Sequence, residues 1–249
     1  SKKPHLKTKD RDGFTHKIWE VWKENDIKVY QEIVKKNKII IADGHHRYIT
    51  SLRHSKDGGC NYIMAMFIDF NDPGLVIFTS HRQVHRIPVD SIAQLKEKTE
   101  DYFDITEMDS CVHLKDRLEK DREKHVFGCY FQDTYLLFTL KEHIQPEEII
   151  SGKKPDEWKK LDIPILHEIL FAKCLGIGNE DIDFIKDTEK GIEHVDEGKI
   201  EALFLINPTK LEEVQRITNL GEIMPQKSTY FYPKPLSGLV IHKHTDTIE

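Results

Sequence analysis

Three consecutive isoleucines followed closely by a glycine constrain the fold of this chain more than any other segment. Residues 39–41 are all β-branched, which predicts a buried strand over residues 39–42. Gly44 then allows a sharp change of direction, and residues 48–54 have the composition of a short helix. Because the first turn of a helix leaves backbone N–H groups without partners, this order of elements predicts an anion site at the turn.

The side chains of this turn are chemically active in four of five consecutive positions. Arg47 is a two-pronged donor suited to phosphate, and His45 and His46 are donors or acid–base groups. Asp43 has three candidate roles, as a base, as a magnesium ligand or as an orienting partner of a histidine. The spacing matches neither a Walker loop nor a dinucleotide fingerprint. The alternative interpretation is a tight turn whose polar side chains only face water.

A second polar segment follows the predicted strand at residues 75–78. Its His81 and Arg82 repeat the chemistry of the first turn, so they could converge on the same anion. The alternative is an exposed polar loop.

A third segment, residues 224–234, is bracketed by prolines and rich in donors and aromatic rings. Lys227 supplies a point charge for phosphate, Ser228 and Thr229 supply hydroxyl groups, and Tyr230 supplies a ring that could stack on a base. This combination suits a nucleotide site. The alternative is a loop whose aromatic rings cover one edge of the core.

The composition excludes several classes of protein. The net charge of −6 over 249 residues argues against a nucleic-acid binder, and no apolar run approaches the length of a membrane helix. The four cysteines lack Cys-x-x-Cys spacing, which favours a reduced, cytoplasmic protein without a cysteine zinc site. No signal peptide is visible, and the start at Ser1 indicates a fragment or a processed form of something longer.

Strands alternate with helices along the chain, and hairpins interrupt the alternation. Residues 62–70 and 75–78 are predicted to form one hairpin, and residues 126–131 and 135–140 another. An apolar helix is predicted over residues 165–175, where His167 is read as a satisfied core histidine. The fold class is therefore an α/β (α+β) protein with a mixed sheet.

The division into domains is predicted from composition along the chain. The polar segment 141–160, with Gly152 and two prolines, is predicted to be a linker or a lid. It would separate a first part, residues 1–140 with the phosphate-binding turn, from a C-terminal α/β part, residues 161–249 with the Lys-Ser-Thr motif.

Taken together, residues 41–48, 79–82 and 224–234 resemble a known family. It is the bacterial and archaeal family catalogued as domain of unknown function number one thousand and fifteen, and the resemblance spans nearly the whole chain. Members of that family are usually longer at the N-terminus.

The turn itself is similar, over a few residues, to the nucleotide-binding turn of the ParB and sulfiredoxin superfamily, which includes a free-serine kinase. This resemblance implies a ParB/sulfiredoxin-like element, a nucleotide phosphate at Gly44 through Arg47, and Asp43 near the reacting hydroxyl or the metal.

The leading hypothesis is an ATP- or ADP-dependent phosphotransferase with Mg²⁺, acting on a small hydroxyl compound such as free serine. Asp43 would be the base or the metal ligand, and His45 and His46 would hold phosphate or relay protons. The cations that would neutralise phosphate oxygens are Arg47, Arg82 and Lys227. The alternatives are a non-catalytic nucleotide-binding switch and a phosphohydrolase that uses a histidine. A homo-oligomer is left open, and neither a membrane nor a nucleic acid is expected as a partner.

Overall fold

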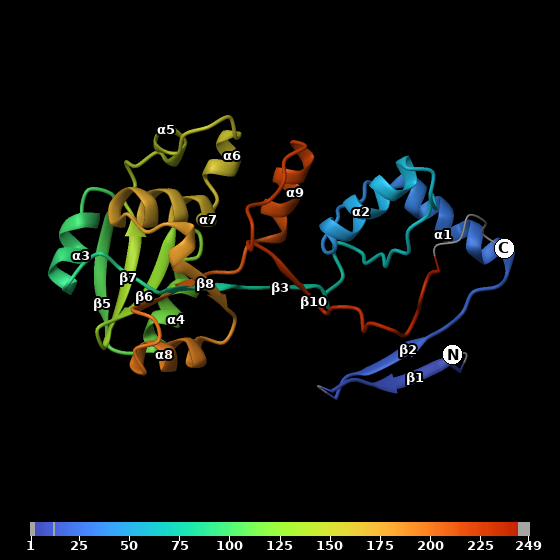
Figure 1. The fold of residues 1–249 in the computed structure, drawn as a ribbon, viewed down its shortest axis with the longest axis horizontal. Helices are drawn as coiled ribbons and strands as arrows, with labels where there is room; N and C mark the ends of the chain where they lie inside the picture. Colours follow the sequence, from blue (N-terminus) through green and yellow to red (C-terminus); the bar gives the residue numbers. More distant parts are fainter. Residues whose placement is uncertain (1–2, 12, 244–249) are drawn as a thin grey trace. The chain divides into compact units, whose positions relative to one another are not determined.

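The computed structural model describes residues 3–11 and 13–243, which form two compact units (Figure 1). Unit 1 comprises residues 1–75 and 233–249, and unit 2 comprises residues 76–232. The chain therefore passes from one unit to the other twice. Each unit is described by itself below.

Unit 1 is built from a strand pair and two helices with little buried apolar surface. Strands β1 (Leu6–Lys9) and β2 (Thr15–Ile18) pair antiparallel. Helices α1 (Glu24–Lys36) and α2 (His45–Lys56) contain no buried residue. Cys60 is the single buried residue among the described residues of this unit.

Two strands predicted in unit 1 are absent from its described residues. Residues 39–42 and 62–70 carry no strand, and most of their apolar side chains are exposed. The physical reason is that a strand needs a neighbour for its N–H and C=O groups, and an apolar run supplies none by itself. The predicted hairpin with residues 75–78 is therefore wrong. The later strand, β3 (Val76–Phe78), belongs to unit 2 and pairs with β10 (Tyr230–Tyr232).

Unit 2 is organised around a six-stranded sheet in which all neighbouring strands are antiparallel. In spatial order the strands are β5 (Phe103–Met108), β7 (Thr134–Leu140), β6 (Val126–Phe131), β9 (Ala202–Ile206), β4 (His81–Val84) and β8 (Ile182–Ile185). The predicted hairpin of residues 126–131 and 135–140 is confirmed as β6–β7. Its turn places Gln132 and Asp133 at positive φ.

Alternation along the strands divides the core of unit 2 into two layers. One face, with Phe127, Phe138 and Phe204, packs against the π-helix η1 (Ile165–Leu175) and against α3 (Ile92–Thr99). The other face, with Leu203 and Leu205, packs against α4 (Cys111–Lys120) and α8 (Thr188–Asp196) (Figure 1). The remaining helices are α5 (Pro146–Ile149), α6 (Asp156–Lys159), α7 (Asp162–Pro164), η2 (Asn179–Asp181) and α9 (Leu211–Asn219). The α+β fold class is thus confirmed, but the predicted mixed sheet is not found, because neighbouring strands in the described sheets all run in opposite directions.

The units differ in extent from the parts predicted at residues 1–140 and 161–249. Strands β4 and β9 come from opposite sides of the segment 141–160 and pair in one sheet. The segment itself carries α5 and α6, and Ile150 is buried in the core. It therefore lies within unit 2. No helix in the described parts of the chain has the length and apolar character needed to cross a membrane.

Candidate functional site

The glycine turn of unit 1 forms the start of helix α2. Gly44 is its N-cap, with φ of 85°, so the helix begins three residues earlier than the sequence predicts and includes His45, His46 and Arg47 in its first turn. A glycine has no side chain with which to cap the N–H groups of that turn, and no side-chain cap bond is made there. These groups and the helix dipole therefore favour a negative charge beside Gly44.

Asp43 lies between two cations at this turn. Its Oδ2 is 3.0 Å from an Nη2 of Arg47, and its Oδ1 is 2.6 Å from Nζ of Lys234. The hydrogen bond from Lys234 is the main reason why the pKa of the Asp43 carboxyl lies below its ordinary value, and Arg47 adds to the effect. Both cations keep exposed surface, 76% for the Arg47 side chain and 29% for that of Lys234. The turn therefore gathers two cations around one carboxylate.

Arg47 folds back over the glycine. A Cβ at Gly44 would lie 2.8 Å from the guanidinium Nη2, which is closer than side chains tolerate. The absence of a side chain at position 44 thus makes room for the Arg47–Asp43 pair as well as for the positive φ. The neighbouring His45 and His46 are exposed, and within the described part of the chain no hydrogen bond joins either imidazole to another residue.

In unit 2, Arg82 is buried on strand β4. The side chain is 0% exposed, and its Nε donates to Nε2 of His167 at 3.0 Å. Another guanidinium nitrogen, Nη1, donates to the carbonyl of Ser80. Burial lowers the pKa of Arg82 to about 10, and burial together with the charge of Arg82 lowers the pKa of His167 to about 4. His167 is therefore a neutral acceptor, in keeping with its predicted role as a satisfied core histidine.

The convergence of His81 and Arg82 on the anion of the first turn stays a prediction, and the structure gives the two side chains different surroundings. Both lie within β4 rather than in a loop, and adjacent residues of a strand point to opposite faces. Nε2 of His81 is 3.2 Å from the hydroxyl of Thr188 on α8, and its Nδ1 is 3.4 Å from the amide nitrogen of Ile206. Burial, with the charge of Arg82 adding to it, lowers the pKa of His81 to about 4.

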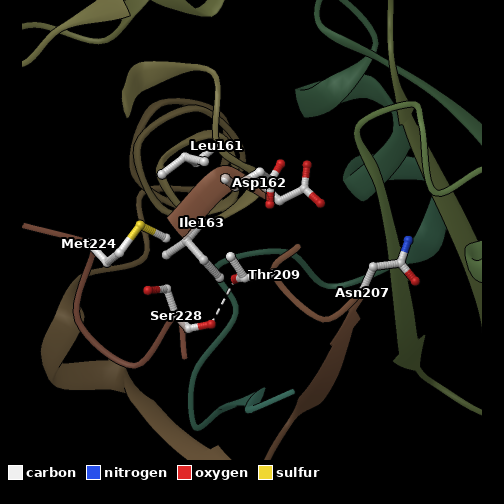
Figure 2. Close-up of a pocket in the computed structure, with 8 residues that line it drawn as sticks. Leu161, Asp162, Ile163, Asn207, Thr209, Met224 and Ser228 are labelled. Atoms are coloured by element: carbon white, nitrogen blue, oxygen red, sulfur yellow. Dashed lines mark hydrogen bonds between the residues drawn. The ribbon is translucent and has the colours of Figure 1, made fainter. Parts of the chain in front are cut away.

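Residues 224–232 of the third predicted segment belong to unit 2, where their side chains make different kinds of contact. The Ser228 hydroxyl donates to the carbonyl of Pro225 at 2.7 Å, and the Ser228 carbonyl accepts from the Thr209 hydroxyl at 2.7 Å (Figure 2). Ser228 also lines a cavity of about 10 Å³, room for about one water molecule. Its hydroxyl therefore serves the local turn.

The other residues of this segment have different surroundings. Nζ of Lys227 lies 5.9 Å from the ring centre of Phe184, and Nζ of Lys186 lies 3.2 Å from that of Tyr230. Thr229 is half-buried. Lys227 has a φ of 56°, a conformation that residues other than glycine seldom adopt.

The contact that joins the first and third motifs is made by Lys234, which sequence reasoning did not single out. It stands at the end of the predicted segment 224–234, immediately after Pro233, and pairs with Asp43 within unit 1. The cations predicted at Arg82 and Lys227 belong to unit 2. The signal for Lys234 was its place in the proline-bracketed motif.

The fit of a metal ion at the turn depends on Asp43. Within residues 3–11 and 13–243, no three His, Cys, Asp or Glu side chains gather in a way that could hold a metal ion. Asp43 would therefore be a single protein carboxylate, which suits Mg²⁺ only where phosphate oxygens and water complete its coordination.

Comparisons with known proteins point to one family and to a few solved structures. A family model described as protein of unknown function (DUF1015) matches residues 1–163. The chain is similar to a conserved hypothetical protein from Pyrococcus furiosus, with 15% identity, 76% of this chain and 68% of that chain covered, and a TM-score of 0.39. It is also similar to a mutant free serine kinase in complex with ADP, with 16% identity, coverage of 85% and 81%, and a TM-score of 0.42. No curated protein matches.

Proposed function

The chain belongs to the DUF1015 family of proteins of unknown function, and we propose that it is a nucleotide-dependent phosphotransferase acting on a small hydroxyl compound. The observation that carries the proposal is the pair of cations, Arg47 and Lys234, held on Asp43 at the uncapped start of helix α2. The proposal rests on these residues and not on the likeness to solved structures. The ParB/sulfiredoxin-like character of the turn stays a prediction.

The turn has the features that a phosphate group requires. The first N–H groups of helix α2, from His45 to Arg47, have no side-chain cap, and a guanidinium and an ammonium are bonded to Asp43 just before the helix. Phosphoryl transfer is catalysed mainly by positioning and by neutralising charge. The two cations and the helix dipole supply that neutralisation, while His45 and His46 add donors beside them.

An exchange of partners links phosphate binding to the reactivity of Asp43. When phosphate oxygens take over Arg47 and Lys234, the interactions that lower the pKa of Asp43 are lost, and its carboxylate becomes a stronger base. The substrate hydroxyl then attacks the terminal phosphorus of the nucleotide and gives its proton to Asp43. The new O–P bond forms as the bond to the leaving nucleotide oxygen breaks.

A bound Mg²⁺ ion would supply further charge neutralisation at the phosphate oxygens. Asp43 is the residue that would hold it, as the single carboxylate of the turn, and in that case it would not be the base. Both roles require the carboxylate, so both predict that Asp43→Asn abolishes transfer. They differ in whether the variant also loses its metal-dependent gain in nucleotide affinity.

A second candidate function, a non-catalytic nucleotide-binding switch, is favoured by one observation. Asp43 is already engaged by two cations, which makes it a weak base until they are displaced. If phosphate binds without displacing them, the turn would bind a nucleotide and transfer nothing.

The proposal is tested by measuring binding and transfer separately. Nucleotide affinity is measured by calorimetry with ATP and with ADP, and transfer by single-turnover assays with labelled ATP and a panel of small hydroxyl compounds that includes free serine. Arg47→Met should weaken nucleotide affinity about tenfold, the size expected when one charged hydrogen bond is lost. Arg53→Met, an exposed arginine in the last turn of the same helix, is the matched control and should leave affinity unchanged.

The outcomes separate the two candidate functions. Nucleotide binding with transfer that Asp43→Asn abolishes supports the phosphotransferase. Binding that depends on Arg47, without transfer to any compound of the panel, supports the switch. If the unmodified protein binds neither ATP nor ADP, or if Arg47→Met and Arg53→Met behave alike, both functions are excluded.

A further inference from the structure

The guanidinium of Arg82 is buried without a complete set of partners. Its Nε donates to His167 and its Nη1 to the Ser80 carbonyl, but its Nη2 is buried and has no partner among the described residues. A buried donor without an acceptor is costly, and an unsatisfied donor on a charged group more so. A native structure seldom leaves such a group without an acceptor. We therefore expect an acceptor from outside the described residues to bind Nη2.

The charge of Arg82 is also uncompensated. No ion pair joins it to a carboxylate in the described parts of the chain, and its side-chain neighbour, His167, is a neutral acceptor. The layer around it contains Val84, Phe171 and Phe204, which offer no negative charge. A buried cation is stable in such surroundings when an anion pairs with it.

A second cation lies close to the same place. The ring of Phe184 is centred 5.0 Å from Cζ of Arg82 and 5.9 Å from Nζ of Lys227. Phe184 is 41% exposed, so its ring is near the buried guanidinium of Arg82, near Lys227 and in contact with solvent. Lys227 is exposed and has no carboxylate partner among the described residues, and its positive φ is a strained conformation of the kind that clusters at binding sites.

We propose that Arg82 and Lys227 form a receptor in unit 2 for a small oxyanion, a carboxylate or a phosphate group, reached past the ring of Phe184. Nη2 of Arg82 binds one oxygen in the low-dielectric interior, and Lys227 attracts the anion from solvent. This receptor is distinct in residues from the turn at Gly44, so it adds a second anion site and does not depend on the proposed phosphotransferase. The guanidinium N–H groups can donate to the oxygens of a carboxylate and to those of a phosphate group.

The test uses the full chain carrying Arg47→Met and Lys234→Met, so that the turn of unit 1 contributes less to the signal. Inorganic phosphate and acetate are titrated separately by calorimetry, with the melting temperature followed in parallel. In this background Arg82→Met is expected to weaken anion binding about tenfold or more, as when one charged hydrogen bond is lost. Lys227→Met should weaken it severalfold. Lys153→Met, which removes an exposed lysine elsewhere in unit 2, should leave it unchanged.

Each outcome decides for or against the receptor. Binding of phosphate alone, of acetate alone or of both, weakened by Arg82→Met and by Lys227→Met, supports it and names the oxyanion. Binding of neither anion overturns it, as does equal binding by Arg82→Met. If Arg82→Met does not fold, Lys227→Met decides, because that side chain is exposed and its removal leaves the core intact. Unchanged binding in Lys227→Met then overturns the receptor.

Discussion

Asp43 and Lys234 are 191 positions apart in the sequence, yet their Oδ1 and Nζ atoms lie 2.6 Å apart in unit 1. This pair joins the glycine turn to the segment that follows Pro233. The pair is partly exposed, with 47% of the Asp43 side chain and 29% of that of Lys234 accessible, so its contribution to stability is small. The proposed function gives the pair a role in binding an anion, because it lies beside the start of α2.

Lys234→Met is therefore expected to weaken nucleotide binding while leaving the stability of the fold nearly unchanged. The free energy of unfolding should fall by less than about 1 kcal/mol, because exposed ion pairs contribute little. Nucleotide affinity should fall about tenfold, since a charged donor to phosphate is lost. Calorimetry and urea unfolding measure the two effects. Lys35→Met, on the exposed surface of α1, is the control and should change neither. A large loss of stability without a loss of affinity would contradict the binding role.

Gly44→Ala should disturb the turn in two ways, and the same substitution at a second glycine distinguishes between them. At a φ of 85°, any L side chain costs about 1–2 kcal/mol. The new Cβ would also lie 2.8 Å from Nη2 of Arg47 and displace the guanidinium. Gly58→Ala, at a φ of 90° with nothing within 4 Å, carries the conformational cost alone. Both variants should lose similar stability, and only Gly44→Ala should lose nucleotide affinity. Equal affinities would show that the position of Arg47 is irrelevant.

The sequence predicts unit 2 better than unit 1, for a physical reason. Strands β6, β7 and β9 are apolar runs that find neighbours in one sheet, so pattern and structure agree. The runs at residues 39–42 and 62–70 are also mainly apolar but have no strand partner in the described residues. Composition reports the capacity to form a strand, whereas pairing depends on what the rest of the chain provides.

Some features of the candidate site could be predicted from sequence, and others depend on how the chain folds. Gly44 and its polar neighbours were found because a glycine turn before a helix is a local pattern. The opposite orientation of His81 and Arg82 was also available from sequence, since strand neighbours alternate between faces. The pairing of Asp43 with Lys234 was not available, because it depends on how two distant segments meet. The unpartnered nitrogen of Arg82 likewise emerges only from the packed core.

Ser228→Ala tests whether this hydroxyl serves the turn or a ligand. The hydroxyl donates to the Pro225 carbonyl at 2.7 Å, and Ser228 is 6% exposed. Its removal should therefore cost about 1 kcal/mol of stability, the usual value of one hydrogen bond. Nucleotide and phosphate affinities should stay unchanged. Ser151→Ala, at an exposed serine of unit 2, is the control for stability. Loss of affinity at unchanged stability would restore the phosphate-binding role predicted from sequence.

Two half-buried histidines of unit 2, His81 and His167, should make its stability depend on pH. The pKa of His81 and that of His167 are each about 4 in the folded chain, against an ordinary value of 6.5. The unfolded chain therefore binds more protons between these values, so stability is full above about pH 6.5 and falls as the pH drops toward 4. Each unit of pKa depression corresponds to about 1.4 kcal/mol.

Substitution of one histidine should reduce this dependence. In His167→Gln the amide oxygen can still accept from Nε of Arg82 but does not titrate, so the slope of unfolding free energy against pH should fall by about one proton between pH 6.5 and 4. Urea unfolding at several pH values measures the slope. His143→Gln, at an exposed position of unit 2, should leave the slope as it is in the unmodified chain. An unchanged slope in His167→Gln would mean that His167 does not resist protonation, and the neutral acceptor assigned to Arg82 would then be wrong.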